Sequence, residues 1–213
     1  YSHYKIEGDI WSVEPEYKIS PNILEYRLAL FESSYYRLNI FKYKNIHLYE
    51  KILYLDCDIL ITNNLQPVFD IAVEDKLYTL KEGCGREQHC HLYTDEEYEK
   101  LDKSLIFSAG ILLFNNTPTM KSFCELTLND IAEHIKNKKI VPHCLDQPFI
   151  IYNSFKLGLS DNTILLNYAK NILNPDPFTG QSICHFPTNP GDYKSKVERM
   201  TYYLNDIRMP YKK

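Results

Sequence analysis

The sequence predicts an α/β fold in a single domain covering residues 1–213. Two short and almost wholly apolar runs, residues 52–55 and 105–114, are typical of strands in the core of a sheet. Apolar residues at helical spacing follow Pro21 and indicate an amphipathic helix. A chain of 213 residues, of which 44% are hydrophobic, suits one domain that buries roughly 70% of its unfolded surface.

The first predicted helix leads to the first predicted strand. The helix is indicated by an apolar stripe of Ile23, Leu24, Leu28, Phe31, Tyr35 and Leu38. Residues 52–55 predict a central strand buried on both faces, because the run is apolar throughout and ends in acid. Residues 59–61 continue extended until Asn63 and Asn64 turn the chain.

The later elements alternate between loops, strands and helices. They are expected as a polar loop at 81–103, a core strand at 105–114, a surface helix at 120–134, a helix at 146–155 and a last short strand at 182–186. Gly110 within the second strand indicates that something approaches the backbone closely there. Asp146 begins its helix on an acid, and Pro148 is tolerated in the first turn.

Charge and hydropathy exclude two classes of partner. The 24 basic and 28 acidic residues give a net charge of -4 and form no basic stripe, so nucleic acid is not expected as a partner. No apolar run approaches the roughly 20 residues that cross a bilayer, so this chain is expected to contain no membrane span. The sequence leaves an oligomer open.

The six cysteines and the N-terminus bear on the compartment. Cysteines at 57, 84, 90, 124, 144 and 184 are too few and too scattered for a disulfide scaffold, which slightly favours a reducing, cytoplasmic compartment. The chain begins at Tyr1 without Met or a signal-peptide hydrophobic region, which suggests an excised fragment. In a luminal fragment Cys84 and Cys90 could form a bridge, so the localisation stays open.

Asp56 and Asp58 are the first candidates for chemistry. They flank Cys57 directly after the strand at 52–55, so two carboxylates lie near one point at the edge of the sheet. Such oxygen ligands suit Mg²⁺ or Mn²⁺ bound together with the phosphates of a substrate. The structural alternative is a pair of acids that only cap a turn, because Asp-x-Asp alone is common.

Four segments, in the same order along the chain, resemble glycosyltransferase family 8, the glycogenin-like family. They are residues 33–70 with Arg37 and the Asp-Cys-Asp motif, residues 107–114, residues 145–149, and residues 184–191 followed by Lys194 and Lys196. The resemblance implies a GT-A fold, which is a Rossmann-like mixed sheet flanked by helices. It also implies a UDP-linked sugar donor and a Mn²⁺ ion on the diphosphate.

 The family places more residues before this motif than the 55 that precede Asp56 here, so the resemblance also implies a domain truncated at its N-terminus.

The resemblance assigns further residues to the donor's metal and phosphates. His185 would be the third metal ligand, and an imidazole beside two carboxylates favours Mn²⁺ over Mg²⁺. Gly191 would let the backbone approach the diphosphate, and Lys196, or else Lys194, would reach the phosphate oxygens. The structural alternatives are a strand histidine satisfied by a backbone partner and two solvated lysines.

Four more residues match family positions near the donor sugar. Arg37 would bind the donor, and Ser108, which stands where the family usually has Asn, would contact the sugar. Asp146 and Gln147 would act as the catalytic pair at the reacting face. A snorkelling surface arginine and a helix-capping acid are the structural alternatives for Arg37 and Asp146.

The implied reaction is retaining transfer of a hexose, glucose or galactose, from the UDP-sugar to a hydroxyl acceptor. No side chain stands out as a nucleophile, so attack on the leaving-group side is expected. Two other functions stay open. One is a non-catalytic or truncated GT-A domain that binds a glycan or a protein partner. The other is a haloacid-type phosphatase, which Leu60, the fourth residue after Asp56, disfavours, because that family has Thr or Val there.

The residues Cys84, His89, Cys90 and His91 form a further candidate cluster. Cysteine and histidine are zinc ligands, but this spacing fits no closed four-ligand site, so a loop is the favoured interpretation. The acceptor, a glycan or a protein hydroxyl, is not encoded in any motif of the chain, because acceptor loops vary on a common scaffold.

Overall fold

The computed structural model describes residues 21–82, 90–103, 106–138, 141–173, 178–187 and 193–208. The chain divides into two compact units. The first comprises the described residues within 1–46, 85–101 and 121–157, and the second comprises those within 47–84, 102–120 and 158–213.

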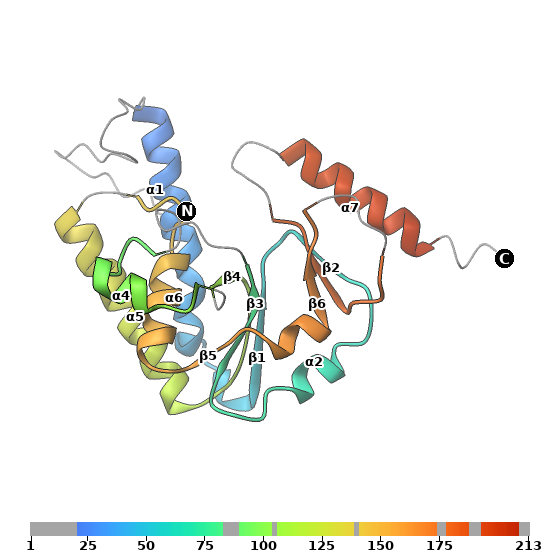
Figure 1. The fold of residues 1–213 in the computed structure, drawn as a ribbon, viewed down its shortest axis with the longest axis horizontal. Coiled ribbons are helices and arrows are strands. Elements are labelled where there is room, and N and C mark those ends of the chain that lie inside the picture. The colour runs from blue at the N-terminus through green and yellow to red at the C-terminus, as the bar shows by residue number, and fades with distance from the viewer. Residues whose placement is uncertain are drawn as a thin grey trace. The chain divides into compact units, whose positions relative to one another are not determined.

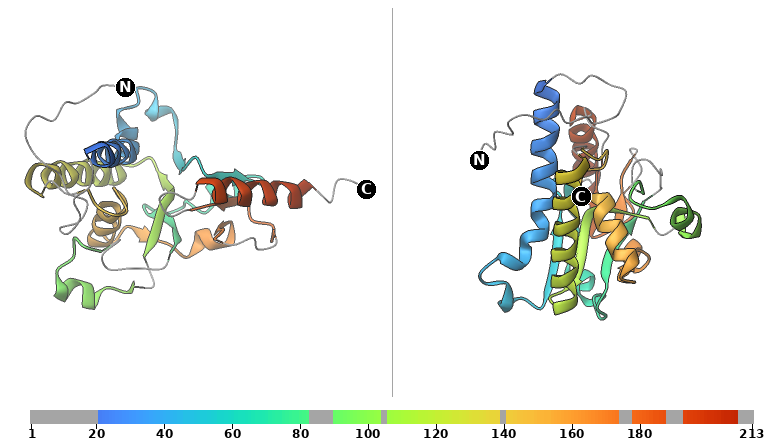
Figure 2. Two further views of the ribbon diagram at one scale, coloured as in Figure 1. Left: turned by 90° about the horizontal axis from the view of Figure 1, so that it is seen from above. Right: turned by 90° about the vertical axis from the view of Figure 1, so that its left-hand side faces the viewer.

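The first unit is built from helices. They are α1 (Pro21–Tyr35), the 3-10 helix η1 (Tyr36–Lys42), α4 (Asp95–Lys100), most of α5 (Pro118–Lys138) and α6 (Gln147–Lys156). Figure 2 shows α1 and α5 side by side. Phe31 of α1 is buried and lies 6.2 Å from the ring of Phe149 in α6, so the apolar stripe predicted for the first helix contributes to the core of this unit.

The second unit holds two small mixed sheets. Their strands are β1 (Lys51–Leu55), β2 (Ile59–Ile61), β3 (Leu77–Lys81), β4 (Phe107–Asn115), β5 (Ser160–Asp161), β6 (Ala169–Asn171) and β7 (Ile183–His185). The helices of this unit are η2 (Ile46–Leu48, at its start), α2 (Gln66–Asp70), η4 (Ile164–Asn167) and α7 (Tyr193–Arg208). One sheet has the order β1-β4-β3-β5 and the other β2-β7-β6 (Figure 1).

Both sheets combine antiparallel and parallel pairs. β4 pairs antiparallel with β1 and β3, whereas β3 and β5 run parallel. In the smaller sheet β7 pairs antiparallel with β2 and parallel with β6. The predicted α/β fold with a mixed sheet and flanking helices is therefore confirmed.

The core strand is β4 and not β1. All but the last residue of β4 are buried, as expected of a strand covered on both faces. The prediction of a central strand at 52–55 is wrong for the described residues, because β1 pairs there with β4 alone and is half-buried. The apolar character of β1 is explained in part by the packing of Leu53 and Leu55 on the core from one face of the strand.

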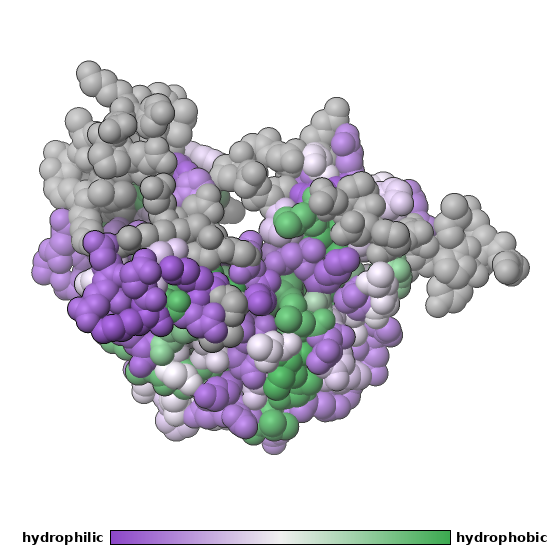
Figure 3. All heavy atoms as spheres, in the orientation of Figure 1, coloured by the Kyte–Doolittle hydropathy of each residue, from purple (hydrophilic) through white to green (hydrophobic). Residues whose placement is uncertain are grey.

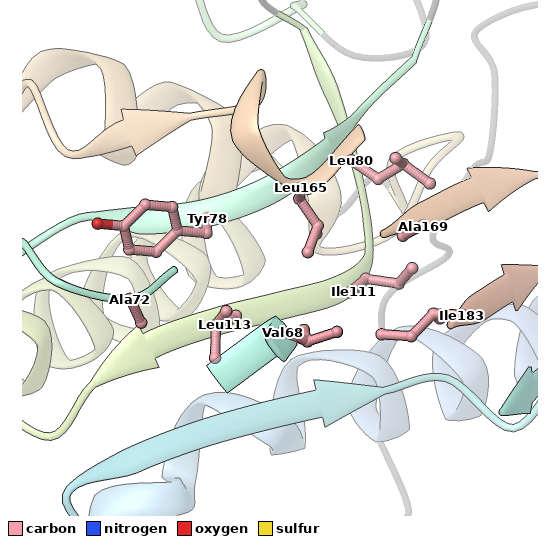
Figure 4. Packing of buried hydrophobic residues seen from close by; sticks show 9 residues of the cluster. All are labelled: Val68, Ala72, Tyr78, Leu80, Ile111, Leu113, Leu165, Ala169 and Ile183. Atoms are coloured by element: carbon pink, nitrogen blue, oxygen red, sulfur yellow. The ribbon is translucent and has the colours of Figure 1, made fainter. Parts of the chain in front are cut away.

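Two apolar clusters hold the second unit together. The larger brings together side chains from α2, β3, β4, η4, β6 and β7, as Figure 4 shows: Val68, Ala72, Tyr78, Leu80, Ile111, Leu113, Leu165, Ala169 and Ile183. The smaller joins α7 to β7 through Cys184, Phe186 and Tyr203. Burial of this kind contributes about 25 cal/mol per Å² of apolar surface, so α7 is held firmly on the smaller sheet.

Several elements of the described residues were not predicted from the sequence, among them α2, β3, β5, β6 and α7. The loop expected at 81–103 contains α4, which begins with a capping box in which Thr94 and Glu97 bond each other's backbone. β6 was missed because three residues are too few to show a period.

Apolar side chains also reach the surface of the second unit. Val73, Ile164 and Leu166 are among those exposed. Figure 3 shows a green area over η4 and α2. Among the described residues, no helix combines the length and hydropathy of a membrane span.

Candidate functional site

The two motif aspartates lie in the turn between β1 and β2. The backbone N–H of Asp56 donates to the Gly110 carbonyl at 2.9 Å, and the Asp58 carbonyl accepts from the Phe186 N–H at 3.0 Å. The Asp56 carboxylate also accepts a 2.6 Å hydrogen bond from the Tyr54 hydroxyl. The turn is therefore hydrogen-bonded to both sheets, and these bonds fix the backbone positions from which the two carboxylate side chains extend.

His185 ends β7 and is paired opposite Ile59 of β2. Its Nε2 lies 3.4 Å from Oδ1 of Asp58, and the residue is only 3% exposed. Its Nδ1 lies 2.8 Å from the side-chain oxygen of Asn171 in β6. The ring is thus held from one side while Nε2 is directed at a carboxylate.

Asp56, Asp58 and His185 form a site that fits a divalent cation. One ligand atom from each residue lies within 4.8 Å of the others. Oδ1 of Asp58 is buried and has no hydrogen-bond partner, which is costly unless a cation occupies the adjacent position. Two carboxylates and an imidazole suit Mn²⁺. In the part of the chain that the structure describes, this is the one group of three such residues with this geometry.

Lys196 joins the same group from α7. Its Nζ donates to Oδ2 of Asp58 at 2.6 Å, and both side chains are mostly buried. Burial raises the pKa of Asp58, but the polar contacts and charges of His185 and Lys196 outweigh it and lower that pKa to about 2. Asp58 is therefore an anion throughout the physiological pH range, as a metal ligand must be.

Gly110 lies directly beneath the group. A Cβ atom at this position would come within 2.6 Å of Cε1 and 2.7 Å of Nε2 of His185, and within 2.9 Å of Oδ2 of Asp56. The close approach expected at this glycine is confirmed, and its partners are two of the candidate ligands. Ser108, also in β4, is buried, and its hydroxyl accepts from the Gly110 N–H at 3.3 Å.

Gly110→Ala is expected to weaken Mn²⁺ binding at least about tenfold and to lower the free energy of unfolding by about 1–3 kcal/mol, because the new methyl group overpacks the site. Gly180→Ala is the matched control: φ is +90° there and no atom lies within 4 Å, so only backbone strain is added. Titration calorimetry and thermal unfolding measure both. Equal Mn²⁺ affinities in the two variants would contradict the steric argument.

The first unit contains a second pair of predicted residues. Arg37 in η1 donates from Nε to Oδ2 of Asp146 at 2.8 Å and from Nη2 to Oδ1 at 2.6 Å. Asp146 is 1% exposed, and its side chain makes no cap for α6. The capping alternative is therefore wrong, because Arg37 engages both carboxylate oxygens.

The backbone before Asp146 is strained. Leu145 has a φ of +54°, in the left-handed region that costs a non-glycine residue about 1–2 kcal/mol. Such outliers persist where the surroundings enforce them and gather at functional sites. Gln147 follows as the first residue of α6 and is half-buried.

Some predicted residues lie outside what the structure describes. Gly191 does, and so do Cys84 and His89 of the cysteine and histidine cluster; the side chain of Lys194 is not described either. Cys90 is buried, and His91 lies among aromatic rings, 6.2 Å from His134 and 6.4 Å from Phe149. The predicted residues that the structure brings together are Asp56, Asp58, His185 and Lys196 in one unit, and Arg37 with Asp146 in the other.

Sequence reasoning missed two partners in the second unit. Asn171 contacts His185, and the guanidinium of Arg199 in α7 donates to the carbonyls of Ile172 and Pro187. Arg199 thus ties α7 to the segments that follow the carboxyl ends of β6 and β7. An arginine one helical turn after Lys196 was the available signal, but nothing in the sequence indicated its acceptors.

Comparison with known proteins agrees with this geometry. The family model described as glycosyl transferase family 8 matches residues 4–173. Galactinol synthase 4 of Arabidopsis thaliana is 28% identical over 120 residues, which cover 50% of this chain and 35% of the plant protein. The chain thus spans about a third of that protein's length. His185 and Lys196 lie beyond the matched residues, so their place in the site rests on the structure. Because the family model matches most of the chain, the chain belongs to glycosyltransferase family 8.

Proposed function

We propose that this chain is the catalytic domain of a retaining glycosyltransferase. It transfers a hexose, glucose or galactose, from a UDP-sugar to a hydroxyl of a glycan or protein acceptor. The observation that carries the proposal is the approach of Asp56, Asp58 and His185 to within 4.8 Å, beside a lysine. Family membership supports the reaction class, and the name of the plant relative, a galactinol synthase, is in keeping with galactose as one of the two hexoses.

Asp56, Asp58 and His185 would hold Mn²⁺ on the donor's diphosphate. A bound Mn²⁺ supplies positive charge against the negative charge that develops on the departing UDP. Lys196, or Lys194 as the alternative, contributes a second positive charge at the phosphates. Gly191 is proposed to let the backbone approach the same phosphates. Ser108 is proposed to lie on the sugar side. Fixed charges of this kind stabilise a leaving group without reorganisation during the reaction.

Arg37, Asp146 and Gln147 are proposed to act at the donor sugar. Asp146 is buried and bound through both oxygens by Arg37, an arrangement that suits a positioning carboxylate better than a nucleophile. This supports attack by the acceptor on the leaving-group side. A covalent glycosyl-enzyme trapped on Asp146 would contradict it.

The test of the proposal is titration of UDP into the protein with Mn²⁺ and again with EDTA. Binding that requires Mn²⁺, followed by Mn²⁺-dependent hydrolysis or transfer from a UDP-hexose, supports the transferase. Metal-dependent binding without any turnover would favour the glycan-binding or partner-binding alternative. Release of phosphate from p-nitrophenyl phosphate would favour the phosphatase, which family membership argues against.

Lys196→Met is expected to change the affinities for metal and nucleotide in opposite directions. Without UDP, Mn²⁺ should bind about fivefold more tightly, because a partly exposed ion pair worth about 1 kcal/mol no longer competes for Asp58. With Mn²⁺ present, UDP should bind about tenfold more weakly, since a charged hydrogen bond to the diphosphate is lost. Lys76→Met, which removes a lysine bound to the Gly158 carbonyl, is the control. A loss of both affinities would contradict the competition.

A further inference from the structure

His185 is positioned by its strand neighbours on both sides. Its backbone is opposite Ile59 of β2 and in register with Asn171 of β6. Its carbonyl accepts from the Ile172 N–H at 2.7 Å. Because β6 and β7 run parallel, the residues in register direct their side chains to the same face of the sheet. The parallel register of β6 and β7 therefore places the side chains of Asn171 and His185 next to each other.

The contact between these two side chains selects a state of the imidazole. The side-chain oxygen of Asn171 lies 2.8 Å from Nδ1. An amide oxygen accepts a hydrogen bond, so Nδ1 carries a proton, and in the neutral imidazole Nε2 then keeps its lone pair. On the other side of the ring, Nε2 is 3.4 Å from Asp58 Oδ1, and that oxygen has no hydrogen-bond partner. A separation of 3.4 Å is longer than an ordinary N–H···O hydrogen bond, as expected of the neutral ring with its proton on Nδ1.

We propose that Asn171 is a positioning residue of the metal site, whose side-chain oxygen holds His185 in the tautomer that presents Nε2 to a divalent cation. The inference rests on the proposed function for the cation, and its own content is the role of Asn171. A metal-ligating histidine normally donates its second ring N–H to such an acceptor, which fixes the orientation of the ring and raises the basicity of the ligating nitrogen. Loss of that acceptor lowers the metal affinity by roughly 10- to 100-fold.

The position of Asn171 favours a role in setting the His185 tautomer over a role in packing alone. The ring of His185 has little free space around it, because a Cβ at Gly110 would come within 2.7 Å of Nε2 and the histidine is almost fully buried. The surrounding strands therefore restrict the orientation of the ring, and the remaining variable is which ring nitrogen carries the proton. The hydrogen bond to Asn171 places that proton on Nδ1.

The experiment compares three substitutions of Asn171 in the intact chain. Asn171→Leu and Asn171→Ala remove the acceptor, with and without the side-chain volume, whereas Asn171→Asp retains an acceptor oxygen. Asn167→Leu, at an exposed position of η4 in the same unit, is the control. Mn²⁺ affinity is measured without nucleotide, from the electron paramagnetic resonance signal of unbound Mn²⁺. Thermal unfolding in EDTA reports whether each variant is folded.

A second measurement does not require the metal. Long-range ¹H–¹⁵N correlation spectra distinguish the two imidazole tautomers, and the His185 signals are identified by their loss in His185→Gln. The metal-free protein should show protonated Nδ1, and Asn171→Leu and Asn171→Ala should lose this preference while Asn171→Asp keeps it. Mn²⁺ should bind about 10- to 100-fold more weakly to the first two variants and without loss to Asn171→Asp and to the control.

The outcomes separate the two proposals. Unchanged Mn²⁺ affinity and an unchanged tautomer in both Asn171→Leu and Asn171→Ala would overturn the role of Asn171 and leave the metal site standing. If Asn171→Asp lost as much Mn²⁺ affinity as Asn171→Leu, the role of Asn171 would be overturned as well, because an acceptor oxygen at this position would then have no effect. If the unsubstituted chain binds no Mn²⁺, the proposed metal site fails and the inference fails with it, whatever the spectra show.

Discussion

Asp58→Asn is expected to reduce Mn²⁺-dependent binding of UDP by about a hundredfold or more. The substitution preserves the shape of the side chain but removes the negative charge that His185 and Lys196 surround. It also replaces one oxygen of a carboxylate whose other oxygen is buried without a hydrogen-bond partner. Loss of a charged ligand weakens a metal site by several kcal/mol, and each 1.36 kcal/mol corresponds to about a tenfold change.

Titration calorimetry of UDP with Mn²⁺ measures the effect, and Asp70→Asn is the matched control. Asp70 is an exposed aspartate of α2 in the same unit, whose carboxylate accepts from Gln66 at 2.9 Å. The control should bind UDP as the unsubstituted chain does. Metal-dependent binding of undiminished strength in Asp58→Asn would remove Asp58 from the proposed site, even if Asp56 and His185 proved essential.

The pKa of Asp58 limits how pH can act on this site. Because the folded-state pKa is lowered from 3.8 to about 2, the charge of Asp58 stabilises the fold above pH 3.8 and this contribution is lost as the pH falls towards 2. Loss of Mn²⁺ binding at milder acidity would therefore have to come from another ligand than Asp58.

The proximity of the three candidate ligands could be predicted from the sequence because they lie at strand ends. Asp56 and Asp58 follow an apolar run, and His185 ends another, so the alternation of apolar segments and polar ends indicated that they lie near one edge of the sheets. Gly110 was also recognisable, as a glycine inside a core strand. Asn171 was not, because its role depends on the parallel register of β6 and β7, and no local pattern encodes which strands pair.

The first unit shows where sequence reasoning reached the residues but not their interaction. Arg37 and Asp146 were both singled out, yet 109 positions separate them, and their pairing depends on how η1 and α6 pack. An acid before a helix indicates a cap by default, so Asp146 was given that alternative. The capping box at Thr94 carried a clear local signal and was overlooked because the surrounding segment is polar.

Arg37→Met is expected to lower the free energy of unfolding by about 3–5 kcal/mol, because it leaves Asp146 as a buried carboxylate without its counter-charge. Urea unfolding followed by circular dichroism measures the change. Arg37→Lys should recover only part of the loss, since an ammonium group cannot supply two parallel hydrogen bonds. An effect below 1 kcal/mol in Arg37→Met would show that water or another group compensates the carboxylate.

The double variant Arg37→Met/Asp146→Leu distinguishes a stabilising pair from a functional one. If the damage in Arg37→Met comes from an uncompensated charge, removal of Asp146 should restore much of the stability, because well-packed apolar residues often replace a buried ion pair without loss. Mn²⁺ binding without UDP should persist in the double variant, since all three proposed ligands belong to the second unit. Sugar transfer should not return with stability. A folded, Mn²⁺-binding and inactive double variant would mean that the pair is retained for its place at the donor sugar, and full activity would assign Arg37 and Asp146 to the fold alone.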